Sequence, residues 1–281
     1  MALICVLTWG STFVITKDLV SFLQPLQLML LRFTLGYAAL WIVHPKWYFK
    51  WKEEWRFLAM ALLANTLYSW AENTALSLTQ ASNVSILVST SPLVTALILA
   101  VFCREKLSRR QIAGFGLAFG GVVLVVLNGA ISLHLNPLGD LLALTASVLW
   151  AGYGMLLRRW SDEYNSILIT RKLLFYGIIT VLPMVLMSDS SIDFARLVTW
   201  GSLAKIGYLG LMGSAVGYIL WNQAVNRIGV LSANMYIYMI PLVTLIVSAI
   251  ALGEKITLMG FCGIILVVFG MVFASLQKKQ S

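Results

Sequence analysis

The sequence predicts an all-α integral membrane protein with ten transmembrane helices, arranged as two inverted five-helix repeats. Three observations lead to this fold class. The 281 residues are 60% hydrophobic and 11% charged, with a mean hydropathy of +0.88, whereas a soluble domain has about 25% charged residues. The apolar runs are continuous, whereas a membrane barrel alternates polar and apolar residues in segments of about ten. Several short motifs occur once in each half of the chain.

The individual elements follow from the charge-free stretches, because a helix needs about 20 residues to cross the hydrocarbon core. Ten stretches approach this length when a charge inside a run is allowed where the flanks require it. They are residues 1–17, 25–44, 56–77, 82–103, 110–131, 138–158, 166–187, 203–225, 231–252 and 256–276. The connections are short, so neighbouring helices are expected to be antiparallel.

In the first half, the opening run is short for a span. Either the native N-terminus lies upstream of Met1 or this helix tilts little. The second and third runs are each interrupted by one charge, Arg32 and Glu72 respectively, while the fourth, 82–103, is among the strongest.

In the second half, the seventh run carries Arg171 and Lys172 close to its start, and we expect the ammonium group of Lys172 to snorkel to the interface. The last three runs are the strongest candidates because their apolar cores are long.

The distribution of lysine and arginine predicts the orientation. If both termini lie on one side, as an even number of spans requires, thirteen basic residues fall on that side and four on the other. The thirteen are Lys46, Lys50, Lys52, Arg56, Arg104, Lys106, Arg109, Arg110, Arg158, Arg159, Arg227, Lys278 and Lys279. Cytoplasmic loops carry such an excess, so we expect both termini in the cytoplasm and the chain in the cytoplasmic membrane, inner or plasma. This placement explains the net charge of +9 without a nucleic-acid partner.

The two halves share motifs at a constant offset of 149 residues. The matching pairs are Asn73 and Asn222, Pro92 and Pro241, Glu105 and Glu254, Gly114 and Gly263, and Gly121 and Gly270. Upstream, at other offsets, Trp9 resembles Trp150 and Arg32 resembles Arg171. We therefore divide the chain into repeats at residues 1–131 and 138–279. Five spans per repeat is an odd number, so the halves insert in opposite directions, as in many secondary transporters.

The sequence resembles the drug/metabolite transporter superfamily, specifically its ten-helix EamA-domain members. The matching elements are the segments 7–13, 30–33, 73–76 and 81–83, the Pro92 and Pro241 segments, 105–107 and 253–255, and the glycines of the fifth and tenth spans. The resemblance covers essentially the whole chain. It implies a metabolite carrier, often an exporter of amino acids or related small molecules, and it does not fix the substrate.

Two ionisable residues lie deep inside predicted spans, where charges are costly and often functional. Arg32 and Glu72 are each expected roughly 9–10 Å from the outer ends of their helices, at the rise of a regular helix. They could form a structural ion pair between two helices. Alternatively, Glu72 could be a proton-coupling site or a contact for a substrate amine.

Polar and aromatic residues recur at helical spacing and predict a substrate cavity. A few polar groups among aromatic rings suit a small amphipathic solute, whereas the alternative for each residue is helix packing or interfacial placement. The candidates are Trp9, Thr12, Asn65, Tyr68, Glu72, Ser85, Ser89, Trp150, Tyr153, Tyr218, Trp221, Asn222, Asn234 and Tyr238.

Pro92 and Pro241 occupy equivalent places inside the fourth and ninth spans. A proline inside a helix removes a hydrogen bond and bends it, so the two are candidate hinges, with a static kink as the alternative. Glycines in the fifth and tenth spans indicate a scaffold or an oligomer face, and we expect a monomer or a weak homodimer.

A basic and aromatic segment at residues 46–56 is expected to anchor the chain at the interface and to contact lipid headgroups. It contains Trp47, Tyr48, Trp51 and Trp55 among its lysines and arginine. Membrane lipids are therefore expected partners, together with a small-molecule substrate.

The expected function is a secondary transporter of small metabolites, such as amino acids or aromatic compounds, working by alternating access. No GxxxxGK[ST] motif is present, so the energy must come from a gradient. A passive channel or facilitator is the alternative. An intramembrane enzyme is a remote third, because the spans offer one glutamate and no histidine. No cofactor and no metal site are expected.

Overall fold

The computed structural model describes residues 1–79, 81–127, 136–188, 193–252 and 257–275. Within these ranges every regular element is a helix, and none is a strand. The elements of the first half are α1 (Ala2–Leu19), α2 (Pro25–Val43), α3 (Trp51–Ala61), η1 (Leu62–Leu67), α4 (Tyr68–Leu78), α5 (Ala81–Val88), α6 (Ser91–Phe102) and α7 (Arg109–Leu127).

In the described part of the second half the regular elements are also all helices, and several of the short ones join end to end. Its elements are α8 (Pro137–Trp160), α9 (Ser166–Leu186), α10 (Phe194–Leu197), α11 (Trp200–Tyr208), η2 (Leu209–Val216), α12 (Gly217–Ile228), α13 (Val230–Met235), η3 (Tyr236–Met239), α14 (Ile240–Leu252) and α15 (Leu258–Ser275). The segments η1 and η2 are π-helical and η3 is a 3-10 helix, and each continues directly into the helices on both sides.

Among the residues that the structure describes, seven helices are long and apolar enough to cross a membrane, so the chain is a multi-pass membrane protein. They are Ala2–Leu19, Pro25–Val43, Val84–Phe102, Pro137–Trp160, Ser166–Leu186, Trp200–Ile228 and Val230–Val247. The predicted spans 56–77, 110–131 and 256–276 are largely helical where they are described, but they are not among these seven. Ten crossings therefore remain a prediction.

Helix ends follow local chemistry. Pro25 and Pro137 occupy the first position of α2 and α8, where a missing N–H costs nothing. The side chain of Asn136 caps α8 by accepting a hydrogen bond from the Gly139 N–H at 3.0 Å. Between α12 and α13 the chain turns at Gly229, whose φ of +80° favours glycine because a side chain would strain the backbone there.

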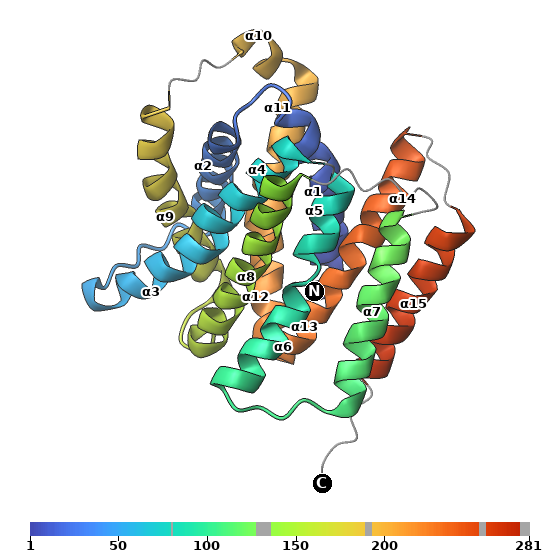
Figure 1. Cartoon of the computed structure of the whole chain (residues 1–281). Coiled ribbons are helices and arrows are strands. Elements are labelled where there is room, and N and C mark those ends of the chain that lie inside the picture. Colours follow the sequence, from blue (N-terminus) through green and yellow to red (C-terminus); the bar gives the residue numbers. More distant parts are fainter. Residues whose placement is uncertain (80, 128–135, 189–192, 253–256, 276–281) are drawn as a thin grey trace.

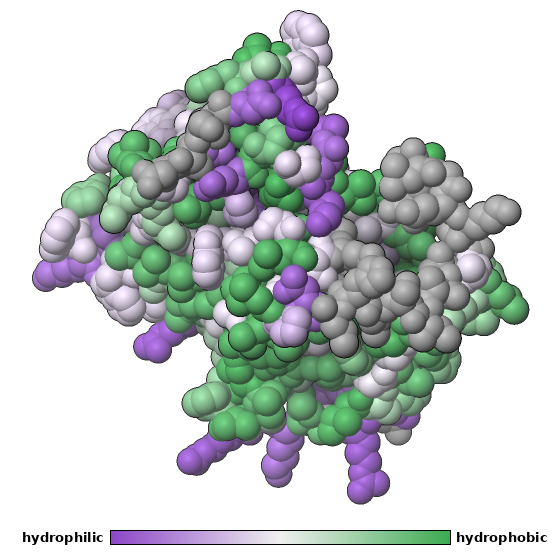
Figure 2. Space-filling view, turned by 45° about the horizontal axis from the view of Figure 1, so that its top comes forward, coloured by the Kyte–Doolittle hydropathy of each residue, from purple (hydrophilic) through white to green (hydrophobic). Residues whose placement is uncertain are grey.

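The helices pack into a bundle in which α7 and α15 lie side by side along one flank, while α9 and α3 lie on the opposite flank (Figure 1). Helix α1 packs one face against α14, α12 and α4, while Leu3, Ile4 and Leu7 on it are exposed. The buried core fills the space between these helices. Broad apolar areas cover the outer surface, and hydrophilic side chains project from its lower edge (Figure 2). This distribution suits a molecule surrounded by lipid.

Four glycines hold α7 and α15 in close and reciprocal contact. A methyl group added to Gly114 would lie 2.6 Å from the Gly270 carbonyl oxygen, and one on Gly121 would lie 2.8 Å from that of Gly263. Methyl groups added to Gly270 and Gly263 would lie similarly close to the carbonyl oxygens of Gly114 and Gly121. Since Gly114 matches Gly263 and Gly121 matches Gly270 by sequence, the contact is the kind that a two-fold axis produces. The inverted arrangement of the whole halves stays a prediction.

Irregular backbone occurs at equivalent places in the two halves. At the offset of 149, η1 coincides with the second part of η2. The helix is also interrupted between α5 and α6, just before Pro92, and it tightens into η3 just before Pro241. Irregular stretches inside helices often mark functional sites or hinges. The hinge role of the two prolines remains a prediction.

Candidate functional site

A small cavity lies in the middle of the bundle, where α1, α2, α4, α5, α8, α12, η3 and α14 meet. Its volume is about 30 Å³, which is space for a water molecule rather than for a metabolite. The lining residues are Trp9, Thr12, Phe13, Arg32, Tyr68, Glu72, Val88, Trp150, Tyr218, Ile237 and Ile240. Seven of these were candidates from the sequence.

Aromatic rings in mutual contact form much of the wall. Trp9 meets Trp150 edge-on, with ring centroids 5.2 Å apart. The candidate Trp221 lies 5.3 Å from both, but it is fully buried and is not among the lining residues. Tyr68 and Tyr218 extend the cluster, at 5.1 and 6.0 Å from Trp150. Such pairs contribute about 0.5–1.5 kcal/mol each beyond burial. The rings therefore pack on one another along the wall of the cavity.

The two π-helical segments provide acceptors for the rings that line the cavity. Trp9 Nε1 donates to the carbonyl of Gly213 in η2, at 3.0 Å. The Tyr218 hydroxyl donates to the carbonyl of Ala64 in η1, at 2.9 Å. Both bonds link distant parts of the chain, so they fix the ring orientations relative to the irregular backbone.

The cavity holds one cation and one carboxylate, and each has a neutral partner. Arg32 Nε donates to Ser214 Oγ at 2.9 Å, and Glu72 Oε1 accepts from the Tyr68 hydroxyl at 2.7 Å. Both side chains are buried. Among the residues described, no ion pair within 4.0 Å joins Arg32 to Glu72. The two charges share the site without neutralising each other directly.

Two sets of buried side-chain hydrogen bonds, which start at Trp150 and at Tyr153, lie on the far side of the rings from the cavity. Trp150 Nε1 donates to Asn234 Oδ1 at 3.2 Å, and Asn234 Nδ2 donates to Thr95 Oγ1 at 2.6 Å. The Tyr153 hydroxyl donates to Asn222 Oδ1. Tyr153, Asn222 and Asn234 thus support the rings from behind and do not line the cavity, although the sequence had placed them with the substrate contacts.

Other sequence candidates lie away from the cavity. Asn65 is fully buried and faces Gly177 of α9, where an added methyl group would lie 3.3 Å from its Cβ. Ser89 Oγ donates back to the Ser85 carbonyl at 2.6 Å. Tyr238 packs into the core beside α7 and α15, and its hydroxyl has no hydrogen-bond partner among the residues that the structure describes.

Sequence reasoning missed four apolar residues of the lining and the partner of Arg32. Phe13, Val88, Ile237 and Ile240 are indistinguishable by type from lipid-facing residues. Only Phe13 had a usable signal, because it follows Trp9 by one helical turn. Ser214 was one small residue in a glycine-rich helix.

A second polar cluster lies near the start of α3. Lys172 is buried there, with its Nζ 2.7 Å from Glu54 Oε1, and Tyr176 donates to Glu54 Oε2 at 2.5 Å. Lys172 is therefore paired with a carboxylate 118 residues away in sequence, and the expectation that its ammonium group snorkels to the interface stays a prediction.

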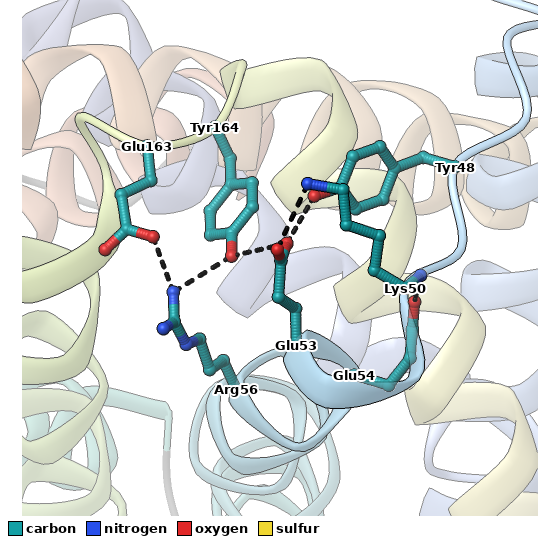
Figure 3. A network of polar contacts seen from close by, with 7 residues as sticks. All are labelled: Tyr48, Lys50, Glu53, Glu54, Arg56, Glu163 and Tyr164. Carbon is teal, nitrogen blue, oxygen red and sulfur yellow. Dashed lines mark hydrogen bonds and ion pairs between the residues drawn. The ribbon is translucent and has the colours of Figure 1, made fainter.

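Next to this pair, Figure 3 shows a network that ties α3 to the α8–α9 connection. Glu53 accepts hydrogen bonds from Tyr48 and Tyr164, and Arg56 pairs with Glu163. The hydrogen bonds from the two tyrosine hydroxyls lower the pKa of Glu53 to about 2.

Comparison with known proteins places these features in a family context. The model of the EamA-like transporter family matches residues 1–127 and 137–276. A protein of Archaeoglobus fulgidus named "Uncharacterized transporter" is 30% identical, over 98% of this chain and 96% of its own length. A protein of Escherichia coli named "Probable amino-acid metabolite efflux pump" is 24% identical, over 96% and 92%. A crystal structure with 19% identity has a TM-score of 0.78 and covers 98% of this chain and 95% of that one, which shows a shared fold.

Proposed function

Because this chain belongs to the EamA-like transporter family, we propose that it is a secondary transporter that exports amino acids or related zwitterionic metabolites across the cytoplasmic membrane. Its family and its named relatives point to transport rather than to catalysis. The name of the Escherichia coli relative supports the substrate class. The bias of basic residues supports cytoplasmic termini.

The observation that carries the substrate class is the pair of charges in the central cavity. Arg32 and Glu72 line the same space, and each is hydrogen-bonded to a neutral group instead of to the other. A zwitterion would supply a carboxylate for Arg32 and an ammonium for Glu72. Charge-assisted hydrogen bonds of this kind are about twice as strong as neutral ones.

The rings around the charges support a preference for apolar or aromatic side chains. Trp9, Trp150 and Tyr218 line the cavity with apolar surface, and sites for small molecules combine such surface with a few fixed polar groups. At about 30 Å³ the cavity is too small for an amino acid. The cycle of alternating access must therefore separate these rings before a solute binds.

The irregular backbone beside the cavity supports the alternating step. Ile237 of η3 lines the cavity, and Pro241 follows it in the next turn. In the first half, Val88 lines the cavity at the end of α5, just before the interruption that precedes Pro92. Bending at these two places would change the distance between the walls, and Glu72 would couple this movement to a proton gradient.

Uptake by proteoliposomes tests the proposal. Labelled phenylalanine is offered with and without a pH gradient and is competed by phenethylamine, which lacks the carboxylate, and by phenylpropionate, which lacks the amine. The wild type should accumulate phenylalanine only with the gradient, and neither competitor should match unlabelled phenylalanine. Equilibration without accumulation would indicate a facilitator, and Glu72 would then have no coupling role.

Substitutions test the separate roles proposed for Arg32 and Glu72. Arg32→Gln should reduce the preference for phenylalanine over phenethylamine, and Glu72→Gln should abolish the response to the gradient. Glu105→Gln removes a carboxylate from an exposed ion pair with Arg158 and serves as the control. If Glu72→Gln and the control respond equally to the gradient, the coupling role is refuted.

A further inference from the structure

A second pocket lies at the end of α2 and shares no lining residue with the central cavity. It is enclosed by the last turns of α2, the connection 44–50 and the first half of α9, and its volume is about 130 Å³. The lining residues are Tyr37, Trp41, Trp47, Tyr48, Phe49, Arg171, Lys172 and Phe175. Six rings and two cations form this wall, and none of these residues lines the central cavity.

The pocket carries one more positive charge than its surroundings neutralise. Lys172 is paired with Glu54. Arg171, which is 4% exposed, donates to the carbonyls of His44 and Lys46 and lies 4.5 Å over the ring of Trp41. In the described part of the chain, no carboxylate lies within 4.0 Å of its guanidinium. A buried cation without a counter-ion is costly, so an anion would be stabilised here.

The rim of the pocket places it at the membrane interface. Trp47 and Phe49 line the pocket yet are well exposed, and Trp51 beside them is 83% exposed. Exposed aromatic residues of this kind gather at the level of lipid headgroups. Ile42 and Val43 in the last turn of α2 are exposed and apolar, as expected for side chains that face acyl chains.

We propose that this pocket binds the phosphate group of an anionic phospholipid, with the Arg171 guanidinium as its counter-ion. A cavity of about 150 Å³ can bind benzene, so a pocket of about 130 Å³ has room for a phosphate group. Basic pockets between helices on the cytoplasmic side suit such headgroups. The lipid would fasten the connection 44–50 to α9, since Arg171 already holds two carbonyls of that connection.

Lipid retention tests the proposal without any transport measurement. The purified chain is reconstituted in phosphatidylcholine nanodiscs with and without phosphatidylglycerol, released, and analysed by native mass spectrometry for bound lipid. The melting temperature is followed in parallel. The wild type should retain phosphatidylglycerol in preference to phosphatidylcholine and should melt at a higher temperature with it.

Variants locate the binding. Arg171→Gln keeps a hydrogen-bond donor for the carbonyls but removes the charge, and it should weaken retention of phosphatidylglycerol at least about fivefold, the factor for one interfacial cation. Arg227→Gln removes an exposed charge elsewhere and should leave retention unchanged. Arg171→Lys keeps the charge and should retain the lipid better than Arg171→Gln, which keeps the test valid if the glutamine variant misfolds.

Three outcomes would overturn the proposal. They are equal retention of the two lipids by the wild type, equal losses in the variants Arg171→Gln and Arg227→Gln, and stabilisation by inorganic phosphate in pure phosphatidylcholine without any effect of phosphatidylglycerol. The last outcome would assign the pocket to a soluble phosphate instead of a lipid.

Discussion

Replacing Glu54 by leucine should strongly destabilise the protein, because it leaves Lys172 buried without a counter-charge. The Lys172 Nζ lies 2.7 and 2.9 Å from the two carboxylate oxygens of Glu54, and the side chains are 10% and 8% exposed. Breaking a buried pair of this kind costs about 3–5 kcal/mol. The rings of Tyr48 and Phe49 lie 6.0 and 5.4 Å from Nζ and retain some attraction, so we expect the lower end of this range.

The double variant Glu54→Leu with Lys172→Met should recover most of the loss. Two apolar side chains of similar volume can replace a buried pair at little cost. The hydroxyl of Tyr176 loses its acceptor in this variant, which costs about 1–3 kcal/mol. The coupling energy of the two substitutions should therefore reach at least about 3 kcal/mol.

Equilibrium unfolding in mixed detergent and dodecyl sulfate micelles, followed by tryptophan fluorescence, measures these differences. Glu105→Leu is the matched control, because its pair with Arg158 spans 2.5 Å while the side chains are 40% and 44% exposed. An exposed pair contributes at most about 1 kcal/mol. The reasoning fails if Glu54→Leu lowers the free energy of unfolding no more than the control does. It also fails if the loss of stability in the double variant equals the sum of the losses in the two single variants.

Three further substitutions probe other parts of the fold. Gly121→Ala should destabilise the protein by about 1–3 kcal/mol, because the methyl group would lie 2.6 Å from the Val267 backbone nitrogen, whereas Gly116→Ala meets nothing within 4 Å; equal melting temperatures would contradict this. Since the folded-state pKa of Glu53 is lowered to about 2, its stabilising effect is present above the ordinary value of about 4.3 and is lost as the pH falls toward 2. The difference in melting temperature between wild type and Glu53→Gln should therefore shrink over that range, and a constant difference would refute it. Tyr238→Phe should be neutral or stabilising in thermal denaturation, because it removes a buried hydroxyl that has no partner in the described parts of the chain; a clear loss of stability would reveal a partner for that hydroxyl.

The sequence was most informative where residue type and position in the repeat agreed. Trp9 and Trp150 were matched by the repeat, and their rings meet at 5.2 Å on the cavity wall. Arg32 and Glu72 stood out because charges are rare inside spans, and both line that cavity. Rare charges inside the spans thus predicted two residues of this cavity, and their role toward a solute stays a prediction.

The sequence could not predict which side chains distant in sequence would pair, or which way side chains would point where a helix is irregular. Lys172 and Glu54 are both near predicted interfaces, and nothing local shows that they meet. Tyr238 shares a helical stripe with Asn234, yet the change to η3 turns its ring into the α7–α15 side of the core. The carbonyls of the π-helical segments accept hydrogen bonds from Trp9 and Tyr218, and only the assembled bundle brings these donors to them.

The close packing of rings in the central cavity also sets the affinity that a solute can reach. The apparent dissociation constant equals the intrinsic one divided by the fraction of molecules in the binding-competent state. Parting Trp9 from Trp150 and Trp221 forfeits two ring contacts of about 0.5–1.5 kcal/mol each. Measured binding should then be roughly 5- to 150-fold weaker than the contacts alone would give. A weakly held solute leaves readily, as fast release on the far side in the proposed export would require.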